Sequence, residues 1–208
     1  MIIPCTKVVH ISDSKGNGVV ATAKIPQGTV TWVFDDLDRE IPMDMLERMS
    51  MPCQEAILTY SYRNTQGHLI FCWDNERFIN HSFRPNCCLT PYQFELAVRD
   101  IEPGEELTND YGTFNIIAPF AVDAEGGDRS TVYPDDLLRY SSLWDAQLHA
   151  AFDRFLHVEQ PLRQVFSVDA WKLAESVARG ETAMASIRNC YYLVQGVVIH
   201  GRNPSIEP

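Results

Sequence analysis

Short β-prone runs separated by turns fill the chain as far as Asn115, and no βαβ repeat occurs among them. The runs are rich in β-branched and aromatic residues and lie at Lys7–Ile11, Val19–Ala23, Thr29–Phe34, His68–Trp73 and Phe94–Val98. A doubly wound parallel sheet needs a helix between successive strands, so this pattern disfavours that fold. The sequence predicts instead a β-rich N-terminal module.

Helical periodicity is short in the first part of the chain and dominates the second. The expected helices lie at Met43–Met49, at Gln54–Leu58, from Pro134 onward and at Val168–Ala178. A loop is expected at Ala124–Thr131 and a final β-prone run at Tyr191–Ile199. We therefore divide the chain into a β-rich domain at 1–115 and a mainly helical region at 116–208.

The chain is acidic, because 28 Asp and Glu side chains against 17 Lys and Arg give a net charge of −11. Such a charge repels nucleic acid, so we expect no nucleic-acid partner, and it would attract a basic peptide. It equally fits a soluble protein that has no basic partner. No apolar run approaches the roughly 20 residues that span a bilayer. No signal-peptide pattern is present, so we expect a cytoplasmic protein without a membrane partner.

The six cysteines form no C-x-x-C or C-x-C pair, and the six histidines show no H-x-x-x-H spacing. The sequence therefore predicts reduced thiols that pack as small apolar residues, and no metal site.

Three segments combine residues suited to ligand binding, and each also has an ordinary structural explanation. Gly16-Asn17-Gly18 lets the backbone approach a ligand, yet Asn-Gly is also the strongest hairpin signal. Asn80 and His81 present adjacent donors and acceptors, which suit a polar ligand edge or a satisfied loop. Tyr111, taken alone, would be a packed side chain at a strand end.

In their order and separation, these segments resemble the SET-domain family of lysine methyltransferases. The resemblance rests on the G-x-G turn at 16–18, on Arg77-Phe-Ile-Asn-His-Ser-Phe-Arg-Pro-Asn86 and on Arg99-Asp-Ile-Glu-Pro-Gly-Glu-Glu-Leu-Thr-Asn-Asp-Tyr-Gly112. It covers about Val8 to Phe114. It implies a mainly β fold of small curved antiparallel sheets with pseudoknot-like threading, followed here by the largely helical C-terminal part.

The resemblance also implies S-adenosylmethionine as the cofactor and a protein or peptide substrate. The cofactor-binding residues implied by motif position are Lys15, Gly16, Asn17, Gly18, Tyr60, Asn80 and His81. Among these, Tyr60 is placed only by its approximate position, and Tyr62 competes with it.

Tyr111 would be the catalytic tyrosine, and Tyr62, Asn109 and Phe114 would line the channel that the lysine enters. A sulfonium methyl is already activated, so the enzyme must mainly align a neutral amine, whose pKa an apolar channel lowers. Tyr111 and backbone carbonyls would orient the amine and stabilise the polarised methyl.

The chain departs from the family pattern at three places. Asn17 stands where many relatives have an aromatic residue, and Phe83 replaces a cysteine of relatives that bind zinc. No cysteine-rich segment follows Gly112, so we expect the C-terminal region to help close the channel. Its candidate aromatic residues are Phe114, Phe120, Tyr133, Tyr140 and Trp144. Asn109 stands where relatives carry Phe or Tyr, which leaves the number of methyl groups open.

Methylation of a protein lysine is therefore the leading hypothesis. Asn17, Asn109 and the unfamiliar C-terminal part motivate an alternative, a SET-fold enzyme acting on a small molecule or peptide in a biosynthetic pathway. A module that only binds a partner is a third, against which Asn80, His81 and Tyr111 argue. The oligomeric state is left open.

Overall fold

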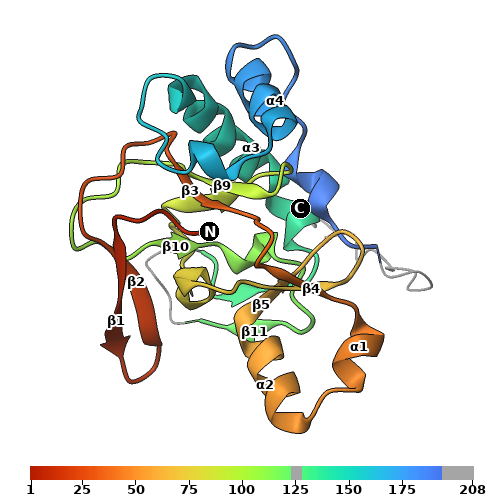
Figure 1. Cartoon of the computed structure of the whole chain (residues 1–208). Helices are drawn as coiled ribbons and strands as arrows, with labels where there is room; N and C mark the ends of the chain where they lie inside the picture. The colour runs from red at the N-terminus through yellow and green to blue at the C-terminus, as the bar shows by residue number, and fades with distance from the viewer. Residues whose placement is uncertain (123–127, 194–208) are drawn as a thin grey trace, which may run out of the picture.

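The computed structural model describes residues 1–122 and 128–193 of the chain. Its first hairpin joins β1 (Thr6–Ser12) to β2 (Gly16–Ala21), which run antiparallel (Figure 1). Gly16 enters β2 with φ of +72°, a backbone conformation that glycine adopts without the steric cost of a Cβ. The hairpin turn lies at Asp13–Lys15, so the expectation that Gly16-Asn17-Gly18 forms the turn is wrong; these residues begin β2, and Gly18 is buried there.

Two three-stranded antiparallel sheets form the body of the N-terminal part. One has the order β3 (Val30–Val33), β9 (Phe94–Ala97), β8 (Cys87–Leu89). The other has the order β4 (Arg39–Ile41), β6 (Leu69–Phe71), β5 (Ser61–Arg63). All residues of β3, β8 and β9 are buried, so both faces of that sheet are covered.

Two further strand pairs are very short. β11 (Phe120–Ala121) runs antiparallel to β12 (Thr131–Val132). β7 (Asn80–His81) runs parallel to β10 (Thr108–Asn109), which pairs Asn80 with Thr108 and His81 with Asn109. This parallel pair brings the Asn80–His81 segment beside the strand that leads into Tyr111.

The helices lie at opposite ends of the molecule in Figure 1. α1 (Met43–Glu47) and α2 (Met51–Tyr60) lie beyond the β4–β6–β5 sheet, and α3 (Asp136–Phe155) and α4 (Val168–Ala178) pack beside β3 and β9. The short 3-10 turns are η1 (Asn75–Phe78), η2 (Tyr111–Thr113), η3 (Arg163–Val165) and η4 (Ile187–Cys190).

A buried aromatic cluster joins the helical region to the central sheet. Phe94 of β9 lies 6.2 Å from Phe152 and 5.2 Å from Phe166, measured between ring centroids. Phe155 of α3 lies 5.1 Å from Trp171 of α4. The parts at 1–115 and 116–208 therefore share one hydrophobic core, and neither buries its apolar surface alone.

The predicted fold class, small β sheets followed by a largely helical part, is confirmed. The helix expected at Val168–Ala178 has those bounds. Two predictions fall partly outside the described residues. Of the loop at Ala124–Thr131, residues 124–127 are not described and Thr131 begins β12. Of the β-prone run at Tyr191–Ile199, residues 191–193 form no strand and the rest is not described. No helix in the described ranges is long and apolar enough to cross a membrane.

Candidate active site

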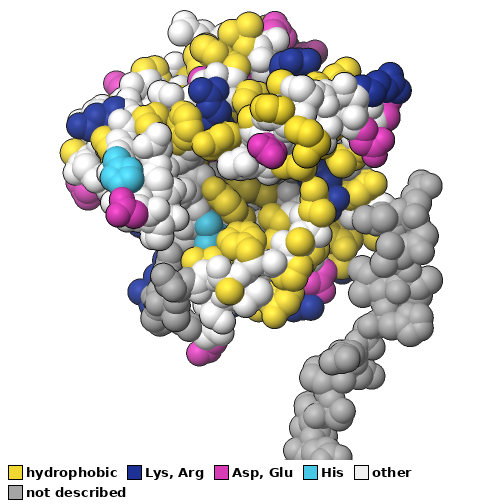
Figure 2. All heavy atoms as spheres, turned by 90° about the horizontal axis from the view of Figure 1, so that it is seen from below, with side chains coloured by type: hydrophobic (Ala, Val, Ile, Leu, Met, Phe, Trp, Pro, Cys, Tyr) yellow, Lys and Arg dark blue, Asp and Glu magenta, His cyan; other side chains and the backbone are white. Residues whose placement is uncertain are grey.

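A cavity of about 330 Å³ opens between α2, β5, η1 and η2. Figure 2, which views the molecule from below, shows a hollow bordered by hydrophobic side chains. Among the residues that line the cavity, Leu58 and Ile117 are about half exposed, at 48% and 56%. The cavity thus reaches solvent across an apolar border.

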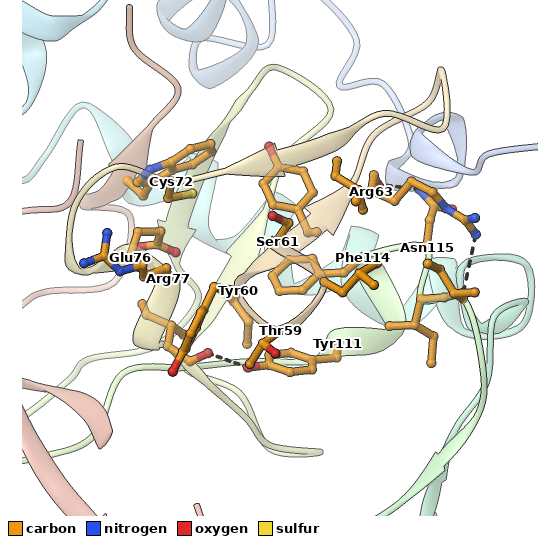
Figure 3. A pocket seen from close by; sticks show the side chains of 18 of the residues that line it. Thr59, Tyr60, Ser61, Arg63, Cys72, Glu76, Arg77, Tyr111, Phe114 and Asn115 are labelled. Carbon is orange, nitrogen blue, oxygen red and sulfur yellow. Dashed lines mark hydrogen bonds between the residues drawn. The ribbon is translucent and has the colours of Figure 1, made fainter. Parts of the chain in front are cut away.

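One wall of the cavity is a continuous row of aromatic rings. The ring centroid of Phe114 lies 5.3 Å from that of Tyr111 and 5.4 Å from that of Tyr62. Tyr62 in turn meets Trp32 edge-on at 6.1 Å, and Phe120 lies 6.1 Å from Tyr111 on the other side. Figure 3 shows Tyr111 and Phe114 lying in the space between Glu76 at one side and Arg63 and Asn115 at the other.

Tyr111 is held at both its hydroxyl and its backbone. Its hydroxyl donates a 2.6 Å hydrogen bond to the carbonyl oxygen of Ile79 (Figure 3), and its backbone N–H donates to His81 Nδ1 at 3.1 Å. Because Nδ1 accepts this bond, the proton of a neutral His81 ring lies on Nε2. Burial raises the pKa of Tyr111 well above its usual range, and Glu76, Glu106 and Glu95 add to the shift. The hydroxyl is therefore a neutral donor at physiological pH.

Arg129 ties the residue before Tyr111 to the helical region. Its guanidinium pairs with Asp110 and, at 2.7 Å, with Asp136 at the start of α3, and both carboxylates are fully buried. The guanidinium also stacks over the rings of Tyr140, at 4.2 Å, and Phe83, at 4.5 Å. Sequence reasoning missed Arg129, because nothing local marks an arginine that bridges two distant carboxylates.

The hairpin glycines meet Asn80 and an acidic side chain that sequence reasoning also missed. Asn80 Nδ2 donates to the carbonyl oxygen of Asn17 at 3.0 Å and to Glu106 Oε1 at 2.8 Å. Lys15 Nζ lies 3.6 Å from the other oxygen of Glu106. A Cβ placed on Gly18 would lie 2.5 Å from Glu106 Oε1. This cluster thus combines a positive and a negative side chain with the backbone of Asn17 and Gly18, and it leaves no room for a side chain at Gly18.

The cavity also has a buried polar patch, formed by Glu76, Glu95 and Asn109. Asn109 Nδ2 donates to both carboxylate oxygens of Glu95, at 2.9 Å each. Burial raises the pKa of Glu95 to about 7 and that of Glu76 well above its usual range. The only sequence signal for Glu95 was a lone acidic residue in an otherwise apolar strand, Phe94-Glu-Leu-Ala97.

Comparison with protein-family models decides the family. The model of the SET domain matches residues 16–112. This chain contains a SET domain. The match begins at the hairpin glycines and ends one residue after Tyr111, so it spans all three motifs. No curated protein matches the chain.

Within this SET domain, the residues expected to form a channel lie together. Tyr62, Asn109 and Phe114 all line the cavity that contains Tyr111. Of the aromatic candidates for closing it, Phe120 also lines the cavity, whereas Tyr133, Tyr140 and Trp144 are not among its lining residues.

The residues expected to bind a cofactor lie in three places. The first is around Glu106, where Lys15, Gly18 and Asn80 lie close to its carboxylate and Asn17 is bonded to Asn80. Gly16 precedes these residues at the start of β2, and His81 lies behind Tyr111. Tyr60 is instead placed among the cavity residues, packed edge-on against Phe78 at 5.5 Å. Over the described ranges, no group of three or more His, Cys, Asp and Glu side chains is arranged to hold a metal ion.

Proposed function

We propose that this SET-domain methyltransferase transfers a methyl group from S-adenosylmethionine to the side-chain amine of a lysine in a protein or peptide. The observation that carries the proposal is the Tyr111 hydroxyl, which sits in an aromatic-walled cavity and is fixed by its 2.6 Å bond to the Ile79 carbonyl. The apolar border at Leu58 and Ile117 suits a macromolecular substrate, because a peptide could lie across it while one side chain enters.

The cluster at the hairpin fits the methionine end of S-adenosylmethionine, which carries one carboxylate and one ammonium group. Lys15 would attract the carboxylate, Glu106 the ammonium, and Asn80 would hydrogen-bond either. Because Gly18 has no side chain, the cofactor could approach its backbone closely. When bound, the cofactor supplies a methyl group that its sulfonium has already activated.

The protein's own residues then prepare the amine. The row of Tyr62, Phe114 and Tyr111 excludes water from a narrow channel, and desolvation favours the neutral amine over the ammonium. The Tyr111 hydroxyl gives its proton to the Ile79 carbonyl, so both oxygens are fixed acceptors that would bind the N–H groups of the amine and leave its lone pair free to attack the methyl. His81 accepts a hydrogen bond from the backbone N–H of Tyr111, and Asp110 accepts one from that of Gly112. The hydroxyl is thus already in position before the reaction and need not move.

Incubation with methyl-labelled S-adenosylmethionine and a cell lysate tests the proposal. We expect the label in a protein band, and hydrolysis of that band should release it as methylated lysine. Label confined to the small-molecule fraction would favour the alternative of a biosynthetic methyltransferase. Cofactor binding without label in either fraction would contradict methyl transfer and favour a binding-only module.

A further inference from the structure

Two buried carboxyl groups belong to residues that line the cavity. Glu76 comes from η1 and Glu95 from β9, and their exposed fractions are 8% and 2%. Neither forms an ion pair with a lysine or arginine anywhere in the described ranges. The nearby Arg77 donates instead to the Trp73 carbonyl at 2.8 Å and stacks over Phe78. Burying carboxyl groups without a basic partner destabilises the fold, so a functional role would explain why they are there.

The patch offers more acceptors than the protein satisfies. The Asn109 amide group is used entirely on Glu95, and its oxygen Oδ1, buried with a residue exposure of 1%, receives no hydrogen bond from the described residues. Glu76 Oε2 likewise receives none from a donor in these ranges. These two atoms have almost no exposed surface, so a ligand in the cavity would meet the other carboxylate oxygens of Glu76 and Glu95, whose residues line it. Carboxylate oxygens call for a ligand with several donors. An ammonium has three donors and no acceptor.

The two carboxyls also act on each other and on the catalytic tyrosine. Burial raises the pKa of both carboxyls and the charge of Glu95 adds to the shift of Glu76, so near neutral pH the pair keeps one proton and carries a single negative charge. Both carboxyls help to raise the pKa of Tyr111, so their field reaches its hydroxyl. The Glu76 carbonyl also accepts from the amide of Ile79, whose own carbonyl accepts from Tyr111.

We propose that Glu76 and Glu95 receive the substrate amine as an ammonium and take up its proton before methyl transfer. The inference rests on the proposed function, since it assigns a proton acceptor to that reaction. One N–H bond of the ammonium breaks, its electron pair stays on nitrogen, and a new O–H bond forms on Glu95. The pair then holds two protons and is neutral, and the second proton returns to water after the product leaves.

The surroundings of the pair suit this exchange. Asp74, the thiols of Cys72, Cys87 and Cys88, and the hydroxyls of Tyr62 and Tyr111 are close enough to interact electrostatically with the pair. The amino group of Met1 is the positive charge that acts on both carboxyls. With a pKa of about 7, Glu95 can both hold and release a proton near neutrality.

Binding of n-butylammonium, which reproduces the end of a lysine side chain, tests the inference without cofactor or turnover. Calorimetry at pH 8 would compare it with the neutral n-butanol in the wild type and in Glu95→Gln and Glu76→Gln. We expect the wild type to prefer the cation by about tenfold, and both variants to lose that preference while binding butanol unchanged. Glu55→Gln, on the exposed face of α2, is the matched control and keeps the preference.

Equal binding of the two ligands by the wild type, or an unchanged preference in both variants, would overturn the inference. Thermal unfolding of each variant checks that it folds, and the two variants give independent tests. A preference that disappears in both variants while no methyl label is found in any fraction would support the cation site and contradict the proposed methyl transfer.

Discussion

The side-chain amide of Asn109 donates to both carboxylate oxygens of Glu95, at 2.9 Å each. Asn109 lies two residues before Tyr111, so one strand end positions both the buried acid and the hydroxyl of the same cavity. Asn109 therefore does more than leave space beside Tyr111, because its side chain also holds the Glu95 carboxyl in place.

The stability of the fold should fall as pH rises through the titration of Glu95. The pKa of this carboxyl is raised from 4.5 to about 7 by burial, so the folded chain binds more protons than the unfolded chain between these values. Stability is then greatest below about pH 4.5 with respect to this group and is lost up to about pH 7. Glu95→Gln should remove the loss and raise the free energy of unfolding at pH 8 by about 1–3 kcal/mol. Urea unfolding at pH 5 and pH 8 measures this, and a wild type whose contribution from Glu95 grows with pH would contradict it.

Tyr111→Phe should lower methyl transfer by about a hundredfold or more, because it removes the fixed hydroxyl oxygen that orients the amine. Binding of S-adenosylmethionine should change by less than about twofold, since the hairpin cluster is untouched. Label incorporation and cofactor calorimetry check the two expectations. Tyr133→Phe, at an exposed tyrosine outside the cavity, is the control and should keep full activity.

Gly18→Ala should abolish cofactor binding. The added methyl would lie 2.5 Å from Glu106 Oε1 and 2.8 Å from Asn80 Nδ2, so it would displace both groups. Calorimetry with S-adenosylmethionine measures the loss. In Gly104→Ala the new Cβ meets nothing within 4 Å, although it carries the strain of a φ of +86°, so binding should persist there. Wild-type affinity in Gly18→Ala would place the cofactor elsewhere.

Arg129→Met should destabilise the protein by about 3–5 kcal/mol, because it leaves the buried carboxylates of Asp110 and Asp136 without their cation. Arg139→Met removes an exposed pair with Asp135 on the same helix and should cost less than about 1 kcal/mol. Denaturant unfolding of the two variants compares them directly. Equal small losses would show that the Arg129 bridge between Asp110 and Asp136 contributes little.

The local elements and the family could be predicted from the sequence, because both depend on residues near one another in the chain. The helix at Val168–Ala178 follows from helical periodicity, whereas the turn of the first hairpin lies at Asp13–Lys15 and Gly16-Asn17-Gly18 begins the strand that follows it. The order of the three motifs indicated a SET domain, and the grouping of Tyr62, Asn109 and Phe114 with Tyr111 followed from it.

Only the tertiary structure revealed the partners that act on these residues. Glu76 and Glu95 are 19 positions apart, and Arg129 joins Asp110 to Asp136 across a stretch with no local signal. Burial decides whether a carboxyl is an ordinary surface charge or a proton-holding group, and burial depends on which distant segments pack over it. The sequence determined which chemistry the chain can carry, and the long-range packing decided where its charges and protons lie.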